Sequence, residues 1–189
     1  NMSILGLTID YGPYGWLEGY DPDWTPNTTD AGGRRYRYAH QPQIALWNLS
    51  RFGGALLPLV GGSQELEAAL QACARSVEQQ YREMMATKLG LSGDTPEDGI
   101  VDDLHAVLRL CETDMTIFFR ALAEIDVTAA SVAKMSDEEL TAPLADAYYA
   151  PEKVSADERA KTAAWLRRYA ARTQQEGLPQ DLRRARMNA

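Results

Sequence analysis

The stretch Asn1–Trp16 reads NMSILGLTIDYGPYGW and is the most strand-like part of the chain of 189 residues. Two short apolar runs, at positions 2–5 and 7–10, flank a turn near Leu5-Gly6, and this pattern predicts a tight β-hairpin. With Leu5-Gly6 as the two-residue loop, Asn1 lies opposite Asp10. Directly opposed residues have Cα atoms about 4.5–5.5 Å apart, so we expect both side chains to reach one ion.

Asn1 and Asp10 carry the oxygen ligands that Mg²⁺ prefers, and proteins hold Mg²⁺ with only one or two carboxylates plus substrate phosphates. Protein kinases use such a pair, a catalytic-loop Asn and the Asp of Asp-Phe-Gly. Asp10-Tyr11-Gly12 stands where that motif would be. Asp-x-Gly is also a common turn signal, so a plain turn residue is the alternative interpretation of Asp10.

The segment at 11–39 is rich in Gly, Pro, Asp and aromatic residues and resembles the activation loop that follows Asp-Phe-Gly. Loops of this length are functional or disordered, and the aromatic residues favour a segment packed on the protein. The aromatic side chains either help to place a substrate protein or, as with Trp16 and Trp24, only anchor the loop. Its arginines, Arg34, Arg35 and Arg37, either meet a phosphate or acidic partner or form a solvated basic edge.

From position 40 onward the pattern predicts a helical lobe of roughly six to eight helices. Pro42 suits the first turn of a helix, Gly61-Gly62 ends it, and Ser63 begins a long helix that ends near Gly90. Further starts are predicted at Thr95-Pro96-Glu97, Met115 and Pro179, and capping boxes at Ser136 with Glu139 and Ser155 with Glu158. The long helix carries an apolar stripe, interpreted as core: Leu66, Leu70, Cys73, Val77, Tyr81, Met84 and Met85.

The predicted fold class is therefore mainly α, as a single-domain fragment over 1–189 with a metal-site hairpin (1–10), an activation-loop-like segment (11–39) and a helical lobe (40–189). The first residue is Asn rather than Met and lies in the candidate site. We therefore expect the chain to be a piece of a longer protein.

Composition excludes several classes. A net charge of −8 argues against nucleic-acid binding, and no apolar run approaches the ~20 residues that span a membrane. Cys73 and Cys111 predict two buried free thiols rather than a disulfide framework, and His40 and His105 lack the neighbours of a zinc site. Sparse cysteine and the lack of a visible signal peptide favour a bacterial cytoplasmic location.

The runs NMSILGLTIDYGPYGWLEGYDP and NTTDAGGRRYRYAHQPQIALWNL closely resemble the selenoprotein O family, also called YdiU-like. The terminal Arg-Met-Asn resembles that family's next shared segment. The resemblance implies the C-terminal helical lobe of a protein-kinase-like (α+β) fold with a short N-terminal β-hairpin. It also implies transfer of AMP from ATP to hydroxyl side chains of proteins, in a family long regarded as pseudokinases.

By this resemblance Asn1 and Asp10 bind Mg²⁺ or Mn²⁺, and Asp10 contacts ATP through the metal ion. The family's base is an Asp immediately before the Asn, so this chain contains no catalytic residue and the fragment alone is expected to be inactive. Pro26 stands where many relatives have Cys, which puts any disulfide control of this loop in doubt.

Three alternatives remain open at this stage. The chain is a non-catalytic kinase-like interaction module, or part of a protein kinase that transfers the γ-phosphate, or a helical scaffold in which Asn1 and Asp10 only close a turn. The residues present do not separate AMP transfer from phosphate transfer, because the groups that orient the nucleotide lie outside the chain.

Overall fold

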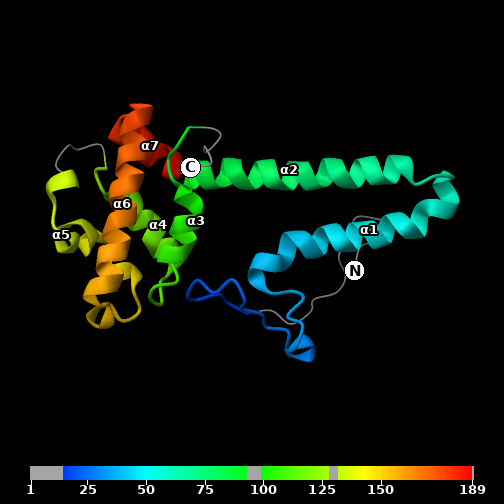
Figure 1. The fold of residues 1–189 in the computed structure, drawn as a ribbon, viewed down its shortest axis with the longest axis horizontal. Helices are drawn as coiled ribbons and strands as arrows, with labels where there is room; N and C mark the ends of the chain where they lie inside the picture. Colours follow the sequence, from blue (N-terminus) through cyan, green and yellow to red (C-terminus); the bar gives the residue numbers. More distant parts are fainter. Residues whose placement is uncertain (1–14, 93–98, 128–131, 189) are drawn as a thin grey trace. The chain divides into compact units, whose positions relative to one another are not determined.

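The computed structural model describes residues 15–92, 99–127 and 132–188. These ranges are mainly helical, as predicted, and within them no strand forms (Figure 1). Two isolated antiparallel bridges, Gly19 with Asp114 and Thr113 with Tyr148, are the only extended pairings there. The predicted hairpin at 1–10 lies outside the described residues, and the kinase-like fold stays a prediction.

The described α-helices begin and end close to the predicted signals. Pro42 lies in the first turn of the first helix, and Gly61, at φ 73°, ends it in the left-handed conformation that favours glycine. The predicted start at Thr95-Pro96-Glu97 lies outside the described residues. The helices are α1 (Gln41–Val60), α2 (Gln64–Lys88), α3 (Ile100–Val107), α4 (Met115–Glu124), α5 (Asp137–Thr141), α6 (Ala156–Glu176) and α7 (Gln180–Met187).

Both predicted capping boxes are confirmed. At the start of α5 the Ser136 hydroxyl accepts the Glu139 N–H, and the Glu139 carboxylate accepts the Ser136 N–H. Ser155 and Glu158 make the same pair of hydrogen bonds at α6. In each box the hydrogen bond from the serine backbone lowers the pKa of the glutamate, since a carboxylate is a better acceptor than a carboxylic acid.

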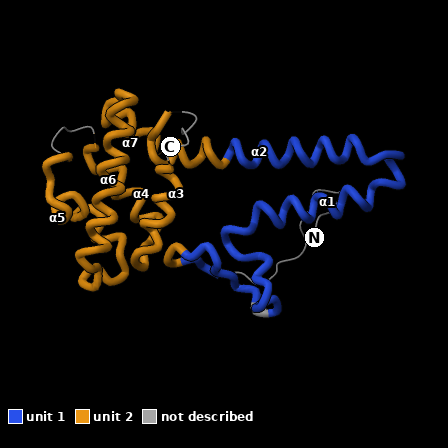
Figure 2. Tube along the Cα trace, in the orientation of Figure 1, with its two compact units in different colours: residues 1–17, 21–80 blue, residues 18–20, 81–189 orange. Residues whose placement is uncertain are grey.

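The described residues divide into two compact units (Figure 2). Unit 1 contains positions 15–17 and 21–80, and unit 2 contains positions 18–20 and 81–188. Whether 1–189 forms one domain stays a prediction.

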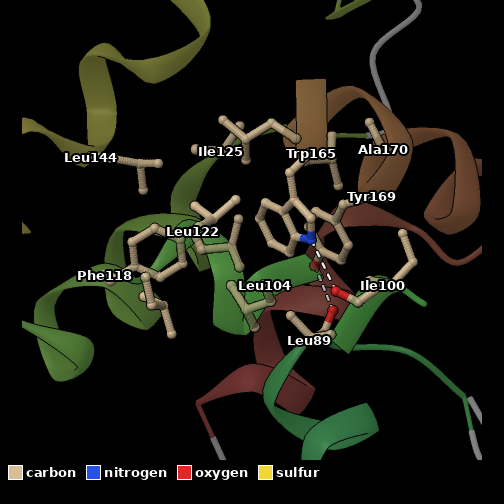
Figure 3. Packing of buried hydrophobic residues seen from close by; sticks show 14 of the residues in the cluster. Leu89, Ile100, Leu104, Phe118, Leu122, Ile125, Leu144, Trp165, Tyr169 and Ala170 are labelled. Atoms are coloured by element: carbon tan, nitrogen blue, oxygen red, sulfur yellow. Dashed lines mark hydrogen bonds between the residues drawn. The ribbon is translucent and has the colours of Figure 1, made fainter. Parts of the chain in front are cut away.

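Unit 2 contains a hydrophobic core (Figure 3). It is built from the C-terminal end of α2, from α3, α4 and α6, and from the segment around 140–147. The rings of Trp165 and Tyr169 on α6 stack with centroids 5.3 Å apart and an interplanar angle of 5°. The indole N–H of Trp165 donates to the Ile100 carbonyl at 3.0 Å, which ties α6 to the start of α3. Leu104, Phe118, Leu122 and Leu166 fill the space beside the rings and are fully buried.

A guanidinium completes this core. Arg183 of α7 is 0% exposed, and its Nη2 donates to the carbonyls of Leu122, Ala123 and Ile125 at 3.3, 2.9 and 2.7 Å. Carbonyls at the end of a helix lack partners within the helix and carry the negative end of its dipole. Arg183 therefore caps the C-terminus of α4 from another helix, and its Nη1 also donates to the Tyr169 hydroxyl at 2.8 Å.

Gly90 ends α2 directly against this cap. Its φ of +66° favours glycine, and a Cβ there would lie 2.5 Å from Cγ and 2.9 Å from the carbonyl oxygen of Arg183. Glycine is therefore required both by the turn and by the close approach of α7.

The prediction that the whole α2 stripe is core is wrong for its first five turns. Met85 and Ala86 are the only buried residues of α2. Leu66, Leu70 and Cys73 are half-buried, and Val77, Tyr81 and Met84 are exposed. A 3.6-residue period identifies the face of a helix that prefers apolar contact, but it does not identify what covers that face.

Candidate functional site

The predicted metal ligands, Asn1 and Asp10, lie outside the described residues, so their role stays a prediction. In positions 15–92, 99–127 and 132–188 no three His, Cys, Asp or Glu side chains gather to hold a metal. No helix in the same ranges is long and apolar enough to cross a membrane. Cys73 and Cys111 are free thiols as predicted, but both are half-buried rather than buried.

Positions 21–39 of the activation-loop-like segment are held by hydrogen bonds within the segment. Asn27 caps a short 3₁₀ turn, η1 (Thr28–Asp30), by accepting the Thr29 N–H at 3.1 Å. Asp30 accepts the Arg34 N–H on its carbonyl at 2.8 Å and the Arg35 N–H on its carboxylate at 2.7 Å. The two bonds close a tight turn, and a Cβ at Gly33 would lie 2.6 Å from the Asp30 carboxylate.

Arg34 adopts φ 43°, which makes it the one non-glycine residue in the described ranges with positive φ. This conformation costs an L-residue about 1–2 kcal/mol, and surrounding contacts hold it in place. Its carbonyl accepts the Arg37 N–H at 3.1 Å, and its guanidinium donates to the Asp23 carbonyl at 3.4 Å. Asp23 also pairs with Arg37 at 3.1 Å, so two of the three predicted loop arginines fix the loop itself.

The two tryptophans of the segment differ in burial. Trp24 is half-buried against Gly15, where a Cβ would lie 3.2 Å from its ring, and its carbonyl accepts the Tyr38 N–H at 2.9 Å. Trp16, by contrast, is 85% exposed, so in the described part of the chain it does not anchor the loop. Whether any of these residues places a substrate stays a prediction.

Arg35, the remaining predicted arginine, lies over an indole ring of α1. Its guanidinium carbon is 5.0 Å from the Trp47 ring centroid, and that of Arg51 is 5.1 Å from the same centroid. Both arginines are exposed, and Trp47 is 41% exposed. Sequence reasoning missed Trp47 and Arg51 here, although their i, i+4 spacing places them side by side on a helix.

Positions 18–20, which precede these turns in the sequence, belong to unit 2. Gly19 pairs with Asp114, and the Tyr20 ring stacks on His105 with centroids 5.4 Å apart. The His105 Nε2 lies 3.1 Å from the Tyr81 hydroxyl, so this histidine contacts side chains from outside its own helix. Burial lowers the pKa of His105, and the nearby Asp102 opposes the shift.

Lowering the pH should reduce the free energy of unfolding through the partly buried His105. Because the pKa of His105 is lower in the folded protein than in the unfolded chain, the unfolded chain binds the proton first as pH falls below about 6.5. The free energy of unfolding should therefore fall between pH about 7.5 and 5.5, and His105→Gln should flatten that dependence. Urea titrations at both pH values measure it, with His40→Gln as the control. If the free energy of unfolding fell as steeply with pH in His105→Gln as in the wild type, His105 would not be the group responsible.

Cys111 and Tyr148 of unit 2 are poor nucleophiles. Burial raises the pKa of the Cys111 thiol and raises that of Tyr148 to about 12, which keeps both protonated at neutral pH. A hollow of about 660 Å³ lies between the end of α4 and α7, but none of the predicted site residues lines it.

Comparison with known proteins gives a consistent identification. The family model described as "Protein adenylyltransferase SelO" matches residues 1–188. The chain is 50% identical over 190 residues to "Protein nucleotidyltransferase YdiU" of Aromatoleum aromaticum and 50% identical over 194 residues to that of an Azoarcus species. The protein of the same name from Rhodopirellula baltica is 49% identical over 195 residues.

These alignments cover all of this chain and 34%, 35% and 36% of the three relatives. The chain thus spans about a third of the length of the curated relatives it matches. Because the family model covers nearly every residue, the chain belongs to the SelO family of protein adenylyltransferases.

Proposed function

We propose that the full-length protein transfers AMP from ATP to Ser, Thr or Tyr hydroxyl groups of proteins. The observation that carries this proposal is the match of the SelO model to residues 1–188. The 50% identity to a protein nucleotidyltransferase supports it. In the transfer, a hydroxyl oxygen of the acceptor protein bonds to the α-phosphorus of ATP. The bond from that phosphorus to the bridging oxygen breaks, and pyrophosphate leaves.

Asn1 and Asp10 would hold Mg²⁺ or Mn²⁺ in this chain, since an amide and a carboxylate oxygen form a donor set suited to these hard cations. When bound, such an ion neutralises charge on the phosphates. The acceptor hydroxyl must also lose its proton, and the family's Asp before Asn1 is the proposed base.

Separate labelling of ATP at the α and γ phosphates tests the proposal in the full-length protein. Label from the α position should appear on protein, and label from the γ position should not. Label from the γ position alone would make the protein a kinase. No label from either position, with ATP binding retained and several acceptor proteins present, would favour the non-catalytic interaction module.

A further inference from the structure

The charge of the chain is unevenly distributed. From position 31 to position 64 there are four arginines, no lysine and no acidic residue, whereas the whole chain has a net charge of −8. The remaining residues therefore carry a net charge of −12. This basic region lies entirely in unit 1 and runs from the loop turns through α1.

The arginines of this region play two different parts. Arg34 and Arg37 bind the carbonyl and carboxylate of Asp23 and stabilise the loop. Arg35 and Arg51 form no ion pair within the described ranges, and each guanidinium lies about 5 Å from the Trp47 ring centroid. Cation–π contact holds both side chains on the ring while their N–H groups stay exposed.

The geometry concentrates positive charge. Two guanidinium carbons that each lie about 5 Å from one centroid are at most about 10 Å apart, which is close to the Debye length of about 8 Å at physiological salt. Both positive charges therefore lie at one exposed ring. A segment with several carboxylates would accept hydrogen bonds from both guanidinium groups.

We propose that Arg35, Trp47 and Arg51 form a docking site for an acidic segment of an acceptor protein. The proposal rests on the function proposed above only in treating the bound segment as part of a protein substrate. Hydrogen bonds of the Arg35 and Tyr36 backbone groups support the site, since the Arg35 N–H donates to Asp30 and the Gln41 side chain donates to the Tyr36 carbonyl. The loop therefore presents Arg35 to Trp47 in a fixed position.

An acidic peptide fits this region better than nucleic acid does. A long polyanion would extend beyond the few residues of the basic region and meet the acidic remainder of the chain, such as Glu65 and Glu67 at the start of α2. A short run of Asp and Glu matches the positive charges of Arg35 and Arg51 and places its carboxylates on these two guanidinium groups.

Peptide binding to the full-length protein tests the site without nucleotide. The probe is a fluorescent peptide rich in Asp and Glu with one serine, beside the same peptide with Asn and Gln in place of the acids. The acidic peptide should bind more tightly, and its binding should weaken as NaCl rises from about 50 to 300 mM. Arg35→Gln with Arg51→Gln should weaken binding at least about tenfold.

The matched control is Arg75→Gln with Arg109→Gln, which removes two exposed charges elsewhere and should change binding less than about twofold. Trp47→Leu keeps both charges but removes the ring, and it should also weaken binding. Equal affinity in the Arg35/Arg51 variant and the wild type would overturn the proposal. So would an oligonucleotide or inorganic phosphate that binds through these arginines where the acidic peptide does not.

The outcome is independent of the transfer chemistry. Arginine-dependent peptide binding without transfer of α label would leave the docking site standing and refute the proposed function. Transfer of α label without arginine-dependent peptide binding would do the reverse.

Discussion

Arg183→Met should lower the free energy of local unfolding of α4 and α7 by about 3–5 kcal/mol. The substitution removes the donor that caps the buried carbonyls of Leu122, Ala123 and Ile125. A buried polar group left without its partner costs about 1–3 kcal/mol, and Gln180, which also donates to the last two carbonyls, compensates only in part. The loss is large beside the 5–15 kcal/mol of a typical domain.

Hydrogen exchange of the α4 and α7 backbone amides in the full-length protein measures this effect. The adjacent Arg184→Met is the control, because Arg184 pairs with Glu124 at 2.9 Å and both side chains are about half exposed. Exposed ion pairs contribute about 0–1 kcal/mol. If Arg183→Met and Arg184→Met had equal effects, the cap would not be an important contribution to stability.

Asp10→Asn should lower the rate of AMP transfer by at least about 100-fold in the full-length protein. Stabilisation of phosphate charge by a metal contributes several kcal/mol, and each 1.4 kcal/mol changes a rate about tenfold. An amide oxygen is a weaker ligand of Mg²⁺ or Mn²⁺ than a carboxylate because it carries no negative charge, whereas it still accepts the hydrogen bonds of a turn. Initial rates with ATP labelled at the α phosphate measure the effect.

A second measurement shows whether Asp10 binds the metal or only closes a turn. Calorimetric titration of ATP with and without Mn²⁺ should show that the metal-dependent part of binding is lost in Asp10→Asn. The control is Asp157→Asn, which alters an exposed i, i+4 pair with Lys161 and should match the wild type in both assays. Reduced folding with unchanged metal-dependent ATP binding would return Asp10 to the role of a turn residue.

Local signals in the sequence were sufficient for most helix boundaries. Proline in a first turn, left-handed glycine at an end and the Ser-x-x-Glu capping box act over a few residues, so they can be recognised without the tertiary structure. Gly61, Ser136 and Ser155 all occupy the predicted positions in the described structure.

The environment of individual arginines could not be predicted from the sequence, because it depends on tertiary contacts. The stretch Arg167–Arg186 is locally basic in sequence, but in the structure Arg167 pairs with Asp137, Arg168 with Asp103, and Arg183 is buried. Residue type alone favours an exposed arginine, and only the packing of α7 against the end of α4 makes Arg183 part of the core. The Arg35–Trp47 contact likewise depends on how a loop folds back on α1.

For the candidate site, the hairpin pattern and the resemblance predict Asn1 and Asp10 as metal ligands. Both residues lie outside the described ranges, so this stays a prediction. The loop arginines were predicted as one group, whereas the structure assigns Arg34 and Arg37 to the loop itself and Arg35 to the exposed face of Trp47. Charge alone does not distinguish these parts, because all three residues are arginines within four positions.

Mass spectrometry of an acceptor protein incubated with the full-length enzyme, ATP and Mg²⁺ or Mn²⁺ tests the proposed AMP transfer most directly. We expect an adenosine monophosphoryl group attached to the hydroxyl oxygen of a Ser, Thr or Tyr residue, and its absence with Asp10→Asn. A phosphoryl group attached there by the wild-type protein instead would show that the protein is a kinase and refute AMP transfer.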